Sequence, residues 1–143
     1  AHRLRGSMIE MGLCDELQRH RLYIALTEAL RNAMYHGNLE VASELRRRGN
    51  GTHYLDLIEE RRWQPPYKDR RIHIDATITG AKAMVRVRDE GPGFDLSVVP
   101  DPTDPVNLDK PDGRGLLLIR TFMDDVRFND TGNEITLIKR REL

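Results

Sequence analysis

The sequence predicts an α/β (α+β) two-layer sandwich, with helices on one face of a mixed, mostly antiparallel sheet. Apolar residues recur at helical spacing within residues 8–36 and again within 115–123. They alternate with polar residues in 71–79 and 82–88, which is the pattern of half-buried strands. Because the chain has 143 residues and no internal repeat, we expect one domain, 1–143.

Residues 8–36 are expected to form one long helix, broken near Gly12, with Asp15 capping its second part. Within this helix, Glu28, Asn32 and His36 are spaced four residues apart and share one helical stripe. The stripe flanks a face that is expected to be buried. The apolar arc of that face consists of Leu22, Ala25, Leu26, Ala29 and Ala33.

Two interpretations of the polar stripe remain open from this segment alone. A carboxylate and an amide at the edge of a buried face cost free energy unless they have partners. Glu28 and Asn32 are also side-chain types that can hold a hydrated Mg²⁺ and place a base near it, since Mg²⁺ keeps several waters and takes few protein ligands. The alternative is a solvated helix flank that ends at Gly37.

An insertion and a β-hairpin follow the first helix. Residues 40–70 contain two short helical patterns, split by Gly49-Asn50-Gly51, and we expect a helical insertion there. The strands 71–79 and 82–88 come next, and the turn at Gly80-Ala81 joins them into a hairpin.

Two glycine motifs follow the hairpin and frame a loop. In Asp89-Glu90-Gly91-Pro92-Gly93, the aspartate ends the second strand and the glycines lie in the turn beyond it. Residues 95–112 hold four prolines and five aspartates with little periodicity, so we expect a loop there. Asp112-Gly113-Arg114-Gly115-Leu116 then leads into the helix 115–123, where glycines let backbone N–H groups approach an anion. The remaining expected strands are 125–129 and 134–140.

The charge balance argues against a general attraction to polyanions. The chain carries 23 acidic and 23 basic residues, so we expect no direct nucleic-acid partner and no membrane partner. Cys14 is the single cysteine, which excludes an internal disulfide and is consistent with a cytoplasmic protein, as is the lack of a recognisable signal peptide or spanning segment. Arginines cluster at 46–48, 61–62 and 70–71, either as a solvated helix surface or as a partner-docking patch.

Three motifs in this order carry a resemblance to a known superfamily. Glu28-x-x-x-Asn32, Asp89-x-Gly91-x-Gly93 and Gly113-x-Gly115-Leu116 resemble the three ATP-binding boxes of the GHKL (Bergerat-fold) superfamily, over about residues 15–141. Within it, the chain looks most like the anti-sigma-factor serine/threonine kinases, because of Asn32-Ala33-x-x-His36-Gly37 and of the segment from Gly115 to the last strand. The resemblance is weakest in the insertion.

The resemblance implies a site for ATP and Mg²⁺. Asn32 would be the Mg²⁺ ligand and Glu28 the general base. Asp89 would accept a hydrogen bond from the adenine amino group, which distinguishes adenine from guanine. Residues 95–112 would be the ATP lid. The other residues that the resemblance places at ATP are Gly91 and Gly93 near the base, Gly113, Arg114, Gly115, Leu116 and His36 near the phosphates, and Thr136 in the water network at adenine.

Three functions from different classes follow from this resemblance. The first is a regulatory kinase that phosphorylates Ser or Thr of an anti-anti-sigma-like protein and also binds a sigma factor or an attached regulatory domain; a homodimer is compatible with it. The second is the ATP-binding module of a two-component histidine kinase, against which the lack of a helical domain presenting a phospho-accepting histidine argues. The third is a non-catalytic nucleotide switch, against which the Glu28 and Asn32 pair argues.

Overall fold

The structure is a computed structural model, and it describes residues 16–42, 51–94 and 114–140. Several sequence-based predictions fall outside these ranges. They concern Gly12, Cys14, Asp15, the arginines 46–48, the lid 95–112 and Gly113.

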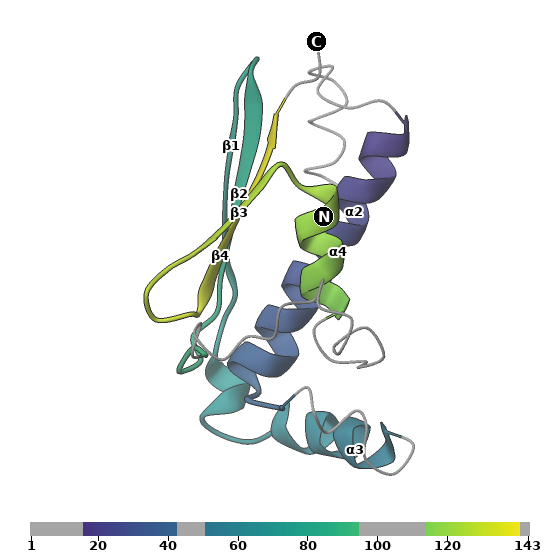
Figure 1. Cartoon of the computed structure of the whole chain (residues 1–143). Helices are drawn as coiled ribbons and strands as arrows, with labels where there is room; N and C mark the ends of the chain where they lie inside the picture. Colours follow the sequence, from purple (N-terminus) through teal and green to yellow (C-terminus); the bar gives the residue numbers. More distant parts are fainter. Residues whose placement is uncertain (1–15, 43–50, 95–113, 141–143) are drawn as a thin grey trace.

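Helices on one face of a four-stranded sheet form the described part of the chain, which confirms the predicted fold class (Figure 1). In chain order the helices and strands are the α-helix α2 (Glu16–Arg31), the π-helix η1 (Asn32–Asn38), the α-helix α3 (Thr52–Arg61), the 3-10 helix η4 (Tyr67–Asp69), the strands β1 (His73–Ile78) and β2 (Lys82–Arg88), the α-helix α4 (Arg114–Phe122) and the strands β3 (Asp125–Phe128) and β4 (Glu134–Arg140). The strands and α4 begin and end within a few residues of the predicted bounds, whereas the start of the predicted helix 8–36 lies outside the described residues.

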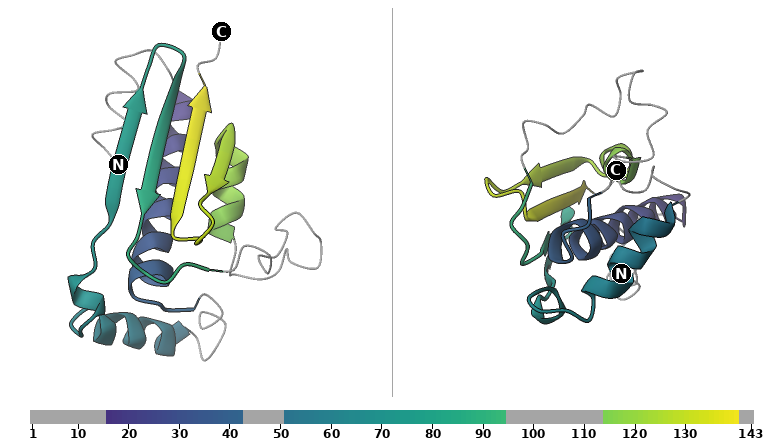
Figure 2. Two further views of the ribbon diagram at one scale, coloured as in Figure 1. Left: turned by 90° about the vertical axis from the view of Figure 1, so that its left-hand side faces the viewer. Right: turned by 90° about the horizontal axis from the view of Figure 1, so that it is seen from below.

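The sheet has the strand order β1-β2-β4-β3, and among the described strands every pairing is antiparallel. Figure 2 shows the sheet in front of the helices in its left-hand view. The register places Val85 of β2 between Ala76 of β1 and Leu137 of β4. Because side chains alternate across a strand, these three residues share one face of the sheet.

The core lies between that face and the two helices α2 and α4, which pack against each other. From α2 and the start of η1 it receives the predicted apolar arc, and from α4 it receives Ile119, which is fully buried. Apolar burial of this kind is the main favourable contribution to folding. The buried core residues are Leu22, Ala25, Leu26, Ala29, Ala33, Ala83, Val85, Val87, Ile119, Met123 and Leu137.

The first described helix differs from the prediction in one respect. The sequence pattern predicts a regular helix to residue 36, but from Asn32 to Asn38 the chain forms a π-helix. A π-helix closes hydrogen bonds from residue i to i+5, so each turn takes more residues than an α-turn, and such segments are frequent at functional sites. The stripe that joins Glu28, Asn32 and His36 in a regular helix is therefore interrupted.

α3 lies in the predicted insertion 40–70, beyond the end of α2 and apart from the two layers (Figure 1). Only Tyr54 of α3 is buried, whereas Leu55 and Trp63 are largely exposed. In the part of the chain that the structure describes, no helix has the length and apolar character needed to cross a membrane.

Candidate functional site

Glu28 and Asn32 lie under the first turn of α4. A Cβ atom added to Gly115 would lie 2.6 Å from Oε2 of Glu28 and 3.7 Å from Nδ2 of Asn32. The glycine therefore lets the start of α4 approach both polar side chains of α2 and η1. This contact joins two motifs that are more than 80 residues apart in the sequence.

The start of α4 has the electrostatics of an anion site. The first N–H groups of an α-helix lack partners within the helix, and the helix dipole favours negative charge there. Glu28 supplies one negative charge beside it, and Arg31 lies 3.7 Å from the Glu28 carboxylate. Glu28 is 19% exposed and Arg31 is 48% exposed, so this ion pair contributes little to stability.

Asp89 and two glycines form a second cluster at the other end of η1. A Cβ atom on Gly37 would overlap the Asp89 carboxylate, and a Cβ atom on Gly91 would overlap the carbonyl group of Gly37. The backbone of η1 thus packs directly against Asp89 and Gly91, which only residues without a side chain permit. The end of β2 and the end of η1 form one tightly packed corner.

Asp89 is held as a buried carboxylate in this corner. Its Oδ1 accepts a hydrogen bond of 2.8 Å from the N–H of Gly91, and its own N–H donates to the carbonyl of Asn133 at 2.9 Å. Burial raises the pKa of Asp89 above its ordinary value, against the lowering effects of the Gly91 N–H and of Arg70 and Arg88. The Gly91 N–H is bound to Oδ1, and an ionised carboxylate has acceptor capacity beyond one such bond.

Gly93 packs against the turn between β3 and β4, and its predicted place near the base stays a prediction. It has a φ of +82°, and a Cβ atom there would overlap the carbonyl of Thr131. Gly132, in the turn after β3, also has a φ of +82° and packs equally closely on Phe94. The ring of Phe94 contacts that of Phe128 edge to face at 5.5 Å. Gly93 therefore anchors the chain to the turn between β3 and β4.

The remaining predicted site residues lie in different surroundings. Leu116 lies half-buried in the first turn of α4, next to Gly115, while the side chain of Arg114 is outside the described part of the chain. His36 hydrogen-bonds the carbonyl of Val41 through Nδ1 at 2.6 Å, and its ring lies 6.3 Å from that of Tyr54. These contacts attach His36 to the insertion; its predicted approach to phosphate stays a prediction.

Thr136 is not brought together with the other predicted residues. In β4 it pairs with Arg86 of β2, whereas its neighbour Leu137 pairs with Val85. Since Leu137 and Val85 face the helices, Thr136 faces the opposite side of the sheet. The register therefore separates Thr136 from Asp89, which packs on η1 at the helical side.

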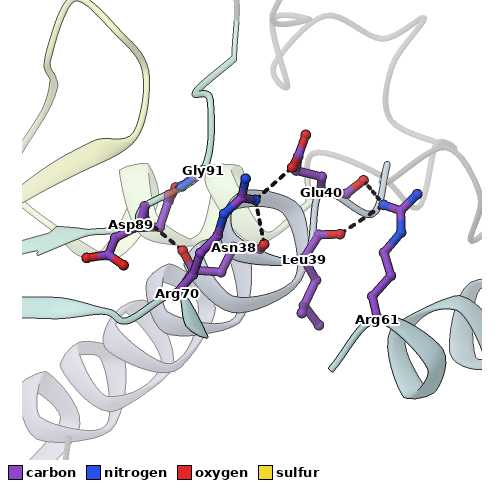
Figure 3. Close-up of polar contacts among 8 residues, drawn as sticks. Asn38, Leu39, Glu40, Arg61, Arg70, Asp89 and Gly91 are labelled. Carbon is purple, nitrogen blue, oxygen red and sulfur yellow. Dashed lines mark hydrogen bonds and ion pairs between the residues drawn. The ribbon is translucent and has the colours of Figure 1, made fainter. Parts of the chain in front are cut away.

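Asn38 is a site residue that the sequence analysis missed. This side chain is buried, and its Oδ1 accepts a hydrogen bond of 2.7 Å from the N–H of Glu90, within the Asp89 turn (Figure 3). Its Nδ2 donates to the carbonyl of Arg71 at 3.1 Å. The sequence signal was the Gly37-Asn38 pair, which reads equally well as an ordinary helix end.

The side chains near the start of α4 include the ligand types that a hydrated Mg²⁺ takes. No cluster of three or more His, Cys, Asp or Glu that could hold a metal occurs within residues 16–42, 51–94 and 114–140. Mg²⁺ commonly binds through one or two protein oxygens, with waters and substrate phosphates completing its shell. The amide of Asn32, beside the Glu28 carboxylate, supplies donors of that kind.

The described fold therefore has a buried carboxylate at one end of η1 and a helix N-terminus beside polar side chains at the other. Residues 3–139 match the family of histidine kinase-like ATPase domains, and the chain belongs to this family. Membership implies ATP binding and a regulatory function based on it. Among curated proteins, none is similar enough in sequence to count as a match.

Proposed function

We propose that this domain is a Mg²⁺-ATP-dependent regulatory kinase of the anti-sigma-factor type, which phosphorylates Ser or Thr of a partner protein. One observation carries the proposal: Glu28 and Asn32 both lie against Gly115 at the start of α4. A domain that only binds nucleotide needs the amide and the helix N-terminus, but it needs no carboxylate at the phosphates. Glu28 gives the site a base where a nucleophile would attack.

In this proposal the phosphoryl group passes from ATP to a hydroxyl oxygen of the partner. Glu28 takes the hydroxyl proton as the oxygen attacks the γ-phosphorus, and ADP leaves. The N–H groups at the start of α4 hold phosphate oxygens. Bound Mg²⁺, held by Asn32, would neutralise charge on the phosphates. Because position and charge neutralisation dominate phosphoryl transfer, Asn32 and the α4 turn contribute to the rate as well as to binding.

The opposite end of the site would select the base. The Oδ2 atom of Asp89 accepts a hydrogen bond from the adenine amino group, while Oδ1 remains bound to Gly91. Guanine presents a carbonyl oxygen at the same position, so two acceptors would face each other and repel. The domain should therefore prefer ATP to GTP.

Replacement of Asp89 by asparagine tests this assignment. We expect ATP binding to weaken by about 1–3 kcal/mol, the cost of an imperfect buried hydrogen bond, measured by titration calorimetry. Asp75→Asn is the matched control, because Asp75 is 75% exposed on β1 and pairs only loosely with Arg86 at 3.9 Å. Equal ATP affinity in the Asp89→Asn variant and the wild type would refute the Asp89 role.

The kinase activity itself is tested on candidate partners. Anti-anti-sigma-like proteins from the source cell are incubated with the domain and Mg²⁺-ATP, and phosphosites are mapped by mass spectrometry. Phosphoserine or phosphothreonine that depends on Glu28 supports the kinase. ATP binding without any transfer supports a nucleotide switch, and phosphohistidine on a partner supports a histidine-kinase module.

A further inference from the structure

Two arginines of the insertion donate hydrogen bonds to the C-terminal end of η1 and the residues just after it (Figure 3). Arg70 donates from Nη1 to the carbonyl of Asn38 at 2.9 Å and to the carboxylate of Glu40 at 2.7 Å. Arg61 donates to the carbonyls of Leu39, at 2.9 Å, and of Glu40. The last carbonyls of a helix lack partners within the helix, and cations are favoured beside them. The two arginines therefore supply hydrogen-bond donors to the backbone carbonyl groups at and just after the end of η1.

The ring of Tyr67 contacts both guanidinium groups. Arg61 lies 5.1 Å and Arg70 lies 5.3 Å from its centroid, within the range of cation–π attraction. The Arg70 side chain is only 19% exposed, so it is unlike a freely solvated surface arginine. The side chains of Arg61 and Arg70 are thus engaged within the domain, and the partner-docking interpretation of the arginine clusters stays a prediction.

Asn38 connects the arginine contacts at the end of η1 with the turn that contains Asp89. Its carbonyl accepts from Arg70, while its side chain bonds the N–H of Glu90 and the carbonyl of Arg71. Glu90 in turn accepts a hydrogen bond of 2.9 Å from the N–H of Arg71. A continuous set of hydrogen bonds therefore runs from Arg70 through Asn38 to the residue that follows Asp89.

We propose that Arg70 is a positioning residue for nucleotide recognition, which holds Asn38 and thereby the Asp89-Glu90-Gly91 turn in the geometry that accepts adenine. This proposal rests on the proposed function and deepens it, because it assigns the insertion to the control of ATP affinity. Arg70 acts through Asn38 and through its charge, and it does not touch the nucleotide.

The positive charge of Arg70 should affect the pKa of Asp89, which a purely structural role for Arg70 would not do. Arg70, ahead of β1, and Arg88, at the end of β2, both lower the pKa of Asp89, whereas burial raises it more strongly. η1 faces Asp89 with Gly37, which carries no side chain, and the adjacent Glu90 is paired with His73 at 2.7 Å. Loss of the Arg70 charge should therefore raise the pKa of Asp89 further.

The direction of the pH effect follows from the role of the carboxylate. Ionised Asp89 is the stronger acceptor for the adenine amino group, because protonation turns one carboxylate oxygen into an O–H donor, so ATP affinity falls as the pH drops through the pKa of Asp89. A higher pKa in the Arg70→Gln variant moves this loss of affinity to higher pH. At the acidic end of the profile, ATP binding should be roughly threefold to tenfold weaker than in the wild type.

The experiment compares Arg70→Gln and Arg70→Lys with the control Arg62→Gln. Arg62 lies in the same segment but is exposed, and its described polar contact is with Glu59. The titration of the Asp89 carboxyl carbon is followed by NMR without nucleotide, and ATP affinity is measured by calorimetry across pH. We expect a raised Asp89 pKa and a shifted affinity profile in Arg70→Gln. In Arg70→Lys we expect the wild-type pH midpoint but weaker ATP binding, because the charge remains while the guanidinium contact is lost. No change is expected in Arg62→Gln.

The two readouts separate this proposal from the proposed function. If the wild type fails to bind ATP, the proposed function is lost, but the NMR titration still decides the effect of Arg70 on Asp89. If the wild type binds ATP while both Arg70 variants keep its pH midpoint and affinity, the positioning role is overturned. If Arg70→Gln does not fold, the Arg70→Lys variant decides. Wild-type ATP affinity of this variant at every pH would overturn the positioning role. Weaker ATP binding with an unchanged pH midpoint would support it.

Discussion

Replacement of Glu28 by glutamine is expected to leave ATP binding intact and to lower phosphoryl transfer about a hundredfold or more. Glutamine keeps the size of the side chain that faces Gly115 but cannot take a proton. The Glu28 carboxylate lies 2.6 Å from the position of a Gly115 Cβ atom. A larger replacement would therefore displace α4, and the loss of the base could not be separated from that displacement. Single-turnover transfer to a confirmed substrate and calorimetry with ATP measure the rate and the affinity separately.

Glu16→Gln is the control for this prediction, because Glu16 is exposed at the start of the same helix. It removes the same charge from α2 but should leave the rate unchanged. A Glu28→Gln variant that transfers phosphate at the wild-type rate would rule out the general base and favour catalysis by positioning alone. A variant that loses ATP binding would instead assign Glu28 to the binding of the nucleotide.

Gly37→Ala is expected to weaken ATP binding more than tenfold and to lower the free energy of unfolding by about 1–3 kcal/mol, as overpacking usually does. The added methyl group overlaps the Asp89 carboxylate, so either that carboxylate or the end of η1 must move. Both groups belong to the packed corner of β2 and η1 that we propose binds adenine, so the displacement should affect ATP affinity as well as stability. Calorimetry and chemical denaturation measure the two quantities.

Gly80→Ala is the matched control, since a Cβ atom at Gly80 meets nothing within 4 Å. A surface change of this kind usually alters stability by no more than about 0.5 kcal/mol, and ATP affinity should not change. If Gly37→Ala behaves like Gly80→Ala, the close packing of η1 on Asp89 is not needed for nucleotide binding. If it loses stability but keeps ATP affinity, the corner is structural only.

The strands and most of the helices were predictable because their signals are local. The alternation in 82–88 corresponds to β2, Lys82–Arg88, and the pattern in 134–140 corresponds to β4, Glu134–Arg140. A half-buried strand must alternate, and a helix packed on a sheet must repeat its apolar residues every three to four positions. The ordering of the strands, with β4 between β2 and β3, has no such local signal.

The predicted insertion shows where local signals are insufficient. Its charge pattern indicates a helix with an exposed surface, and α3 has one. The sequence did not distinguish Arg61 and Arg70, which bond the carbonyls at the end of η1, from the neighbouring Arg62, which is exposed. All three are arginines in a polar stretch. They differ only in whether they reach the carbonyl groups at the helix end, which lie 21 to 32 residues away in the sequence.

By itself, the sequence predicted the fold class, because helical and strand periodicity are local, and it singled out Glu28, Asn32 and Gly115 through their resemblance to known ATP-binding motifs. The tertiary structure alone decided four matters: the π-helical form of Asn32–Asn38, the packing of Gly37 on Asp89, the face on which Thr136 lies, and the link from Arg70 to the Asp89 turn. Each depends on which distant backbone atoms come within contact distance. Such contacts are set by the packing of whole layers, which no local pattern specifies.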